Sequence, residues 1–238
     1  VGTPSVEENK INSKYYTIPV QGGTATLVED YKSLLADKNV SPDGKYFLSS
    51  QEVKVEKLLG KDLYPELSKT TAQVYTGLDY RHWDTWNDGT HNHFFYSENK
   101  KDAVGIDIMP NEPFDAPQKP FGGDEDFIWS PDGTKIIYVC KKKVGTAYAT
   151  STNTDLYSYD IASGKTTNLT ESMPGYDLNP SFNQKNELAW MSMRRDGYEA
   201  DKQDIIVWNG YTKMNLTGNN DEIHVEGFKW SDDGTRIY

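Results

Sequence analysis

Three stretches of the chain repeat one pattern: residues 39–50 read NVSPDGKYFLSS, residues 127–139 read FIWSPDGTKIIYV, and residues 228–238 read FKWSDDGTRIY. Each places a Ser-(Pro/Asp)-Asp-Gly turn between an apolar approach and an apolar strand start. The Asp of such a turn bonds its own backbone, and the Gly supplies the positive φ that the turn needs. Because a repeat at fixed phase is a strong signal of fold, the chain is predicted to consist of repeated strand pairs.

A second repeated element has the form of a hairpin with glycine in its turn. Its copies are residues 13–29 (SKYYTIPVQGGTATLVE), 154–171 (TDLYSYDIASGKTTNLTE) and 203–218 (QDIIVWNGYTKMNLTG). Gly23 and Gly164 lie 141 residues apart, which is three units of 47. The Asn-Leu-Thr triplets that begin at Asn168 and Asn215 also lie 47 residues apart. Hairpins in this phase agree with the turn repeat.

Four-stranded repeats of about 40–50 residues are typical of β-propeller blades. The unit starts are expected at Ser41, at a degenerate WNDG turn with Trp86, Asp88 and Gly89, at Ser130, at residues 180–183 and at Ser231. In the fourth start, Asn183 and Lys185 replace the Asp-Gly pair. The fold class predicted for residues 1–238 is therefore all-β, a single partial propeller segment of about four to five blades.

Two segments do not fit a blade. Residues 51–76 are rich in Lys, Glu and Leu and are broken by Gly60 and Pro65, which predicts a short helix or an irregular insertion between blade strands. Residues 109–126 contain four prolines and an acidic run, which is typical of a connection between blades.

Composition limits the partners. The formal net charge is −11, which argues against nucleic acid and against anionic membrane surfaces. The acidity can serve solubility, or it can line a cavity that attracts a cation such as a peptide amino terminus. No window approaches 18 apolar residues, so no membrane span is expected, and residues 1–10 do not have the form of a signal peptide. The single Cys140 excludes an internal disulfide and is expected to be buried.

Several kinds of site are absent from the sequence. There is no G-x-S-x-G elbow and no phosphate loop, and no cofactor is expected. His91 and His93 lie two apart in a predicted strand with Asp88 nearby. A metal site is conceivable there, but strand-end imidazoles that bond the backbone are favoured, so no metal is predicted. Residues 219–222 lack the ligand spacing of a calcium loop and are interpreted as a solvated turn.

Two polar clusters are candidates for binding. In residues 80–86 (YRHWDTW), Arg81, His82 and Asp84 alternate with large aromatic residues. In residues 191–201 (MSMRRDGYEAD), a strand is followed by a charged hairpin loop in which Glu199 can bind an ammonium group, Arg194 can orient it and Tyr198 can form a wall. The plainer alternatives are a blade strand that packs its tryptophans and a solvated hairpin tip. Arg195 and Asp201 are interpreted as a structural pair within the loop.

The order RHWDTW, then SPDG, then SMRRDGYEAD at residues 192–201 resembles the propeller of the prolyl oligopeptidase family of serine peptidases, in its acylaminoacyl-peptidase and dipeptidyl-peptidase 5-like branch of Bacteroidetes. TolB-like propellers share the SPDG turn alone. The resemblance implies a longer peptidase whose α/β-hydrolase domain, carrying Ser, Asp and His, lies outside residues 1–238. It implies a periplasmic or exported protein in which this segment carries no catalytic triad, restricts access and binds the amino-terminal side of peptides. The alternative is a TolB-like module that binds a protein or a glycan without a peptidase.

Overall fold

The computed structural model describes residues 2–7, 10–19, 21–28, 37–78 and 80–238, and the chain divides into two compact units between Val40 and Ser41. The first unit contains one antiparallel sheet. In it, β2 (Lys10–Thr17) pairs with β1 (Gly2–Glu7) on one side and with β3 (Thr26–Val28) on the other. The pairing of β2 with β3 confirms the predicted hairpin around Gly23.

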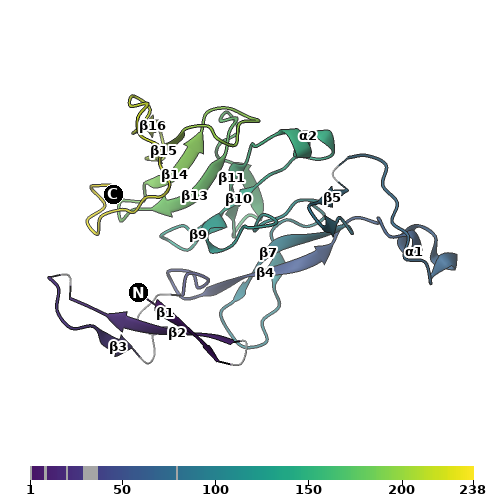
Figure 1. Cartoon of the computed structure of the whole chain (residues 1–238), viewed down its shortest axis with the longest axis horizontal. Coiled ribbons are helices and arrows are strands. Elements are labelled where there is room, and N and C mark those ends of the chain that lie inside the picture. Colours follow the sequence, from purple (N-terminus) through teal and green to yellow (C-terminus); the bar gives the residue numbers. More distant parts are fainter. Residues whose placement is uncertain (1, 8–9, 20, 29–36, 79) are drawn as a thin grey trace. The chain divides into compact units, whose positions relative to one another are not determined.

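Two four-stranded antiparallel sheets follow each other in the second unit, and each is a meander in which chain neighbours are also sheet neighbours (Figure 1). The first comprises β9 (Phe127–Trp129), β10 (Lys135–Cys140), β11 (Asp155–Asp160) and β12 (Lys165–Asn168). The second comprises β13 (Asp177–Phe182), β14 (Leu188–Met193), β15 (Gln203–Trp208) and β16 (Lys213–Asn215). The hairpins predicted at 154–171 and 203–218 are confirmed as β11–β12 and β15–β16.

The third sheet of this unit has a long insertion between two paired strands. β4 (Tyr46–Lys54) pairs along its whole length with β7 (Thr90–Glu98), and β7 pairs with β8 (Ile106–Asp107). The insertion holds α1 (Gly60–Leu63), the 3-10 turn η2 (Pro65–Leu67) and a ribbon of β5 (Arg81–His82) and β6 (Thr85–Trp86). The expected short helix is confirmed, but residues 51–54, predicted to lie in the insertion, belong to strand β4.

The degenerate WNDG turn is not a unit start, and that prediction was wrong. Trp86 pairs with Arg81 in the ribbon, whereas the strand that follows Gly89 pairs with β4. Asp88 does form the expected local turn, since its Oδ1 accepts a hydrogen bond from the backbone N–H of Thr90 at 2.9 Å. Turn chemistry was therefore interpreted correctly, but strand partners were not.

The other turns repeat in atomic detail. The Ser41 hydroxyl donates to Asp43 Oδ1 at 2.7 Å and accepts from the N–H of Tyr46 at 2.9 Å. The same pair of bonds recurs around Ser130 and around Ser231. In the fourth copy Asn183 organises the turn, and Asn186 rather than Lys185 takes the left-handed position, with φ of 63°. Asparagine tolerates that conformation better than other non-glycine residues.

Both faces of the sheet formed by β9–β12 are buried between its two neighbouring sheets. Burial on both faces explains why its strands are almost uninterrupted runs of apolar residues. Alternate residues of β10 face opposite ways. Ile136 and Tyr138 pack with the β4–β7–β8 sheet, where Phe94 meets Phe127 edge to face at 5.2 Å. Ile137 and Val139 pack instead with Leu188, Trp190 and Ile206 of the next sheet. The outer face of β14 and β15 joins a third cluster with residues 225–237. The all-β class is confirmed, although the described residues form no closed ring.

The remaining segments lie at the surface of these sheets. Residues 109–126 connect β8 to β9, as predicted, and end in the 3-10 turn η3 (Asp124–Asp126). α2 (Thr146–Thr150) connects β10 to β11. Cys140 is buried, as expected.

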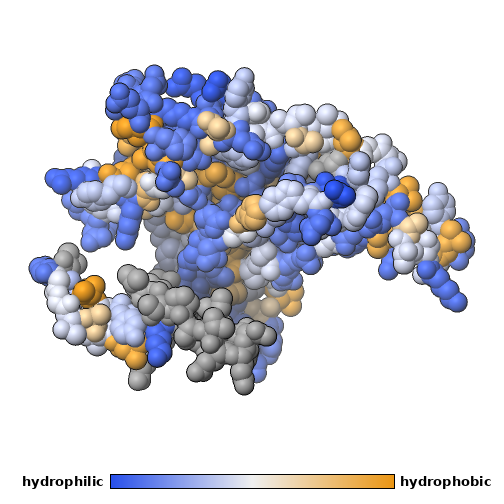
Figure 2. Space-filling view, viewed as in Figure 1, coloured by the Kyte–Doolittle hydropathy of each residue, from blue (hydrophilic) through white to orange (hydrophobic). Residues whose placement is uncertain are grey.

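Figure 2 shows a mostly hydrophilic face with apolar groups near β13–β16 and around α1. None of the helices in the described ranges has the length and apolar character of a membrane span.

Candidate functional site

The insertion leaves and rejoins its sheet at a narrow neck. The backbone N–H groups of Val55 and Glu56 both donate to the carbonyl of Gly89, at 2.8 and 3.1 Å. Gly89 has φ of 84°, and a Cβ at this position would lie 2.3 Å from the Glu56 carbonyl oxygen. Only glycine satisfies both the conformation and the space. The neck therefore fixes where the carboxylate of Glu56 lies relative to β7.

The ribbon β5–β6 carries a strained aromatic residue at its tip. Trp83 has φ of 51°, a left-handed conformation that costs a bulky residue about 1–2 kcal/mol. Its ring packs against the imidazole of His82 and, edge to face at 5.1 Å, against Phe121. Trp83 is nevertheless 62% exposed. Backbone strain of this kind concentrates at binding sites, where the surrounding structure holds an exposed side chain in place.

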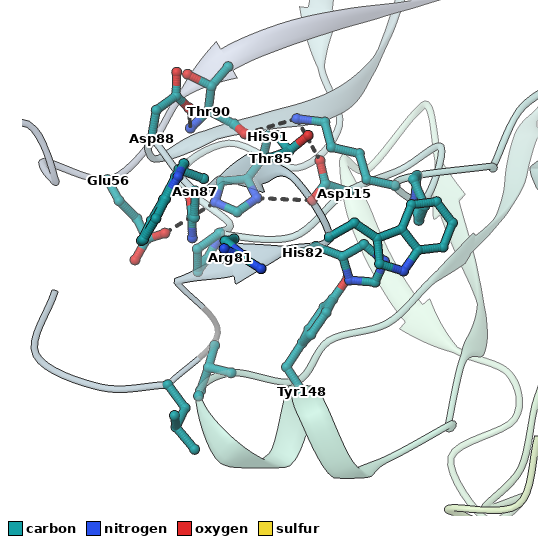
Figure 3. A pocket seen from close by; sticks show the side chains of 18 of the residues that line it. Glu56, Arg81, His82, Thr85, Asn87, Asp88, Thr90, His91, Asp115 and Tyr148 are labelled. Atoms are coloured by element: carbon teal, nitrogen blue, oxygen red, sulfur yellow. Dashed lines mark hydrogen bonds and ion pairs between the residues drawn. The ribbon is translucent and has the colours of Figure 1, made fainter. Parts of the chain in front are cut away.

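A cleft of about 560 Å³ lies between this ribbon, the 109–126 connection and the α2 segment (Figure 3). Five carboxylates line it against three cations, which are Arg81, Lys119 and Lys143. The aromatic side chains in its wall include Trp83, Trp86 and Tyr148. The carboxylates are Glu52, Glu56, Asp84, Asp88 and Asp115. Carboxylates beside aromatic faces suit a cationic group that is attached to an apolar chain.

His91 is largely buried at this cleft and bridges two carboxylates. Its Nδ1 lies 3.2 Å from Asp115 Oδ2, and its Nε2 lies 3.2 Å from Glu56 Oε2 (Figure 3). Burial by itself lowers the pKa of His91, but the hydrogen bonds and charges of Asp115 and Glu56 outweigh burial and raise it above the ordinary value. The same contact and the N–H of Asn92 hold the pKa of Asp115 below its usual range against the effect of burial.

His93 lies apart from that bridge. Its Nδ1 lies 2.9 Å from Asp107 Oδ2, and its Nε2 lies 2.9 Å from the Glu112 carbonyl oxygen. The interpretation that these imidazoles bond the backbone is confirmed only for Nε2 of His93, because Nδ1 of His93 and both ring nitrogens of His91 face carboxylates. Within the described ranges, no three His, Cys, Asp or Glu side chains converge as metal ligands.

The loop between β14 and β15 is held by two sets of contacts. Within the loop, Arg195 donates to Asp201 from its backbone and from its guanidinium, with the shortest contact at 2.7 Å. That hydrogen bond, opposed by burial, lowers the pKa of Asp201 to about 2. The predicted structural pair is confirmed. Outward from the loop, Asp196 Oδ1 accepts hydrogen bonds from Ser151 Oγ and from the N–H of Thr152, both at 2.7 Å.

The structure thus separates the predicted binding residues into two groups. Arg81 and His82 line the cleft, with the guanidinium 5.7 Å from the centre of the Trp86 ring. Arg194, Tyr198 and Glu199 are exposed on the β14–β15 loop and do not line the cleft. Tyr198 lies under the guanidinium of Arg195 at 4.2 Å.

Residues 146–152 connect the cleft to the β14–β15 loop. Tyr148 lines the cleft, while Ser151 and Thr152 hold the β14–β15 loop through Asp196. Sequence reasoning did not identify Glu56, Asp115 or Tyr148 as lining residues. Glu56 and Asp115 lie 35 and 24 residues from His91 in the chain, so no local pattern connects them to it. The acidic composition was the only signal in the sequence for these carboxylates.

The fold and the cleft define an all-β protein built from repeated antiparallel sheets, with an acidic cleft that has aromatic walls. No protein-family model matches the chain. It is 43% identical over 203 residues to a protein named dipeptidyl-peptidase 5 from Porphyromonas gingivalis, an alignment that covers 83% of this chain and 29% of that protein. A protein of the same name from Porphyromonas endodontalis is 42% identical over 164 residues, 68% of this chain and 23% of that protein.

A more distant protein of that name, from Schizosaccharomyces pombe, is 24% identical over 216 residues, which is 85% of this chain and 30% of that protein. This chain therefore spans less than a third of the length of these relatives. It belongs to the dipeptidyl-peptidase 5-like family, and the resemblance found in the sequence is confirmed.

Proposed function

We propose that this chain is the β-propeller region of an exported dipeptidyl peptidase, and that it binds the amino-terminal side of the peptide without performing the chemistry. The observation that carries the proposal is the 43% identity with a protein named dipeptidyl-peptidase 5. Four-stranded meanders that bury both faces against their neighbours support the propeller arrangement. The proposal assigns the serine nucleophile and its partners to an α/β-hydrolase domain of the whole protein.

The proposed role in binding rests on charge. A dipeptidyl peptidase must recognise the free ammonium group of its substrate, and a carboxylate that bonds an ammonium contributes roughly 1.5–3 kcal/mol. Glu199 remains the first candidate, since it is exposed and, among the described residues, no lysine, arginine or histidine forms an ion pair with its carboxylate. Arg194 and Tyr198 flank it in the sequence. Arg81 and His82 supply a second set of polar groups in the cleft.

The test is made on the protein of full natural length. Release of dipeptides is measured from chromogenic substrates with a free amino terminus and from the same substrates acetylated there. We expect release from the free substrates and a much lower kcat/KM for the acetylated ones. Residues 1–238 alone should bind the free peptides without turnover.

Two results would overturn the proposal. One is turnover by residues 1–238 alone, because the chain would then contain its own catalytic groups. The other is a full-length protein that releases no dipeptide and binds only a protein or a glycan, which would make this chain a TolB-like binding module.

A further inference from the structure

The imidazole of His91 is placed so that both ring nitrogens face a carboxylate. A neutral imidazole has one N–H donor and one lone pair, so it can donate to only one of two carboxylates. The doubly protonated imidazolium can donate to both. With Asp115 and Glu56 each 3.2 Å from a ring nitrogen, the geometry is satisfied only by the cationic form.

The two carboxylates belong to different walls of the cleft. Asp115 is firmly anchored in the 109–126 connection, because its Oδ1 also accepts the N–H of Asn92 at 2.8 Å and lies 3.4 Å from Lys119 Nζ. Glu56 lies at the neck of the insertion that carries the ribbon, and its side chain is 39% exposed. Among the described residues, no lysine or arginine forms an ion pair with Glu56. The carboxylate of Glu56 therefore depends on His91.

We propose that His91 is a pH-dependent clasp that ties the insertion to the 109–126 connection while it is an imidazolium and releases Glu56 when it loses its proton. Loss of the bond at Glu56 leaves the backbone bonds of the neck to Gly89 in place, but it removes the side-chain tie between the insertion and the 109–126 connection. The insertion, with the ribbon that presents Arg81 and His82 to the cleft, is then held less tightly. As regulation of peptide binding, the clasp rests on the proposed function. As a property of the fold, it stands without that function.

The surrounding charges favour the cationic form. Lysines near the clasp are already engaged: Lys54 pairs with Asp62, and Lys119 pairs with Asp115 and Glu52. His93, two residues along β7, is turned to Asp107 and the Glu112 carbonyl. The charged and titratable groups of the packed elements are carboxylates, cations and imidazoles from five parts of the chain. They are Glu52 and Lys54 on β4; Glu56, Asp62, Arg81, His82, Asp84 and Asp88 in the insertion; His93 on β7; Asp107 on β8; Glu112, Asp115 and Lys119 in the connection; and Lys143 before α2.

The sign of the effect follows from the raised pKa of His91. A histidine whose pKa is higher in the folded state than in the unfolded state stabilises the fold fully below its unfolded pKa. That contribution is lost as the pH rises through the folded pKa. The insertion should therefore be tightly held in mildly acidic solution and loose in alkaline solution.

The experiment uses residues 1–238 and measures hydrogen exchange of peptides from the insertion at about pH 5.5 and about pH 8.5, corrected for the intrinsic pH dependence of exchange. We expect protection in the insertion to fall about tenfold between the two values, which is the effect of one charge-assisted hydrogen bond at a partly exposed site. The protonation of His91 is followed in parallel by the ¹⁵N shifts of its ring, assigned with the His91→Gln variant.

Three variants separate the clasp from general loosening. His91→Gln should show low protection of the insertion at both pH values. Glu56→Gln leaves the pairing of His91 with Asp115 in place and should also lose the pH response. His224→Gln is the matched control, because His224 is exposed and its Nδ1 lies 3.3 Å from the N–H of Gln203 in another sheet. It should keep the wild-type response.

The proposal is overturned if protection of the insertion is the same at both pH values in the wild type. It is equally overturned if Glu56→Gln keeps the wild-type response, or if the ring of His91 is already neutral at about pH 5.5. None of these measurements uses a substrate. A failure of the clasp is therefore distinguishable from a failure of the proposed peptidase function.

Discussion

As the pH rises toward alkaline values, the chain should lose folding stability. Replacing Asp177 by asparagine should make that loss smaller. Asp177 begins β13 and is fully buried, and its Oδ1 accepts a hydrogen bond from Trp190 Nε1 at 2.9 Å. Its backbone N–H and C=O both bond the hydroxyl of Thr154, each at 3.0 Å. The carboxyl group therefore lies where two neighbouring sheets meet.

Burial raises the pKa of Asp177 from 3.8 to about 7, and the charge of Asp155 adds to the rise. Between the pKa of Asp177 in the unfolded state and its pKa in the folded state, the carboxyl group is ionised only in the unfolded chain. Folding then takes up a proton, so the free energy of unfolding falls as the pH rises, until the pH passes the folded-state pKa. A shift of about three units at 1.36 kcal/mol each sets an upper limit of about 4 kcal/mol. Relaxation and water penetration reduce this limit, and we expect about 2 kcal/mol.

The assay is urea unfolding followed by tryptophan fluorescence, from about pH 4 to about pH 8. The wild type should lose about 2 kcal/mol more than Asp177→Asn over this range, because asparagine keeps an acceptor for Trp190 but cannot ionise. His91 contributes a fall of the same sign in both proteins, so it cancels in the comparison. Asp221→Asn, at an exposed turn, is the control and should follow the wild type. Parallel pH curves for the wild type and Asp177→Asn would refute the reasoning.

Three further outcomes are expected. Asp196→Ala removes the acceptor that holds the β14–β15 loop to residues 151–153. The free energy of unfolding should fall by about 1–3 kcal/mol, and the loop should become a site of limited proteolysis. Cleavage unchanged from the wild type would contradict this. Gly89→Ala should lower the Tm strongly, since its Cβ would overlap a carbonyl at 2.3 Å, whereas Gly77→Ala, with no atom within 4 Å, should not. In the full-length protein, Glu199→Gln should lower kcat/KM about tenfold or more for substrates with a free amino terminus and leave folding unchanged; wild-type kinetics would make Glu199 a solvated carboxylate.

Local turn chemistry was readable from the sequence because it depends on a few adjacent residues. The bonds of Ser41 and Ser130 to the aspartate two residues later recur as the repeat predicted. The WNDG turn was misassigned because a turn shows where the chain reverses and not which strand it then joins.

The candidate site, too, was predictable from the sequence only where it depends on adjacent residues. The sequence by itself identified the turns and hairpins of the two meanders, the structural pair of Arg195 with Asp201, and the two polar clusters that contain Arg81 and Glu199. Only the tertiary structure placed Glu56 and Asp115 on the two sides of His91, 35 and 24 residues away in the chain. Those contacts cross an insertion and a connection whose course is set by how neighbouring sheets pack. A hydrogen bond between such distant residues leaves no periodic or local pattern in the sequence, so it can be found only after the chain has folded.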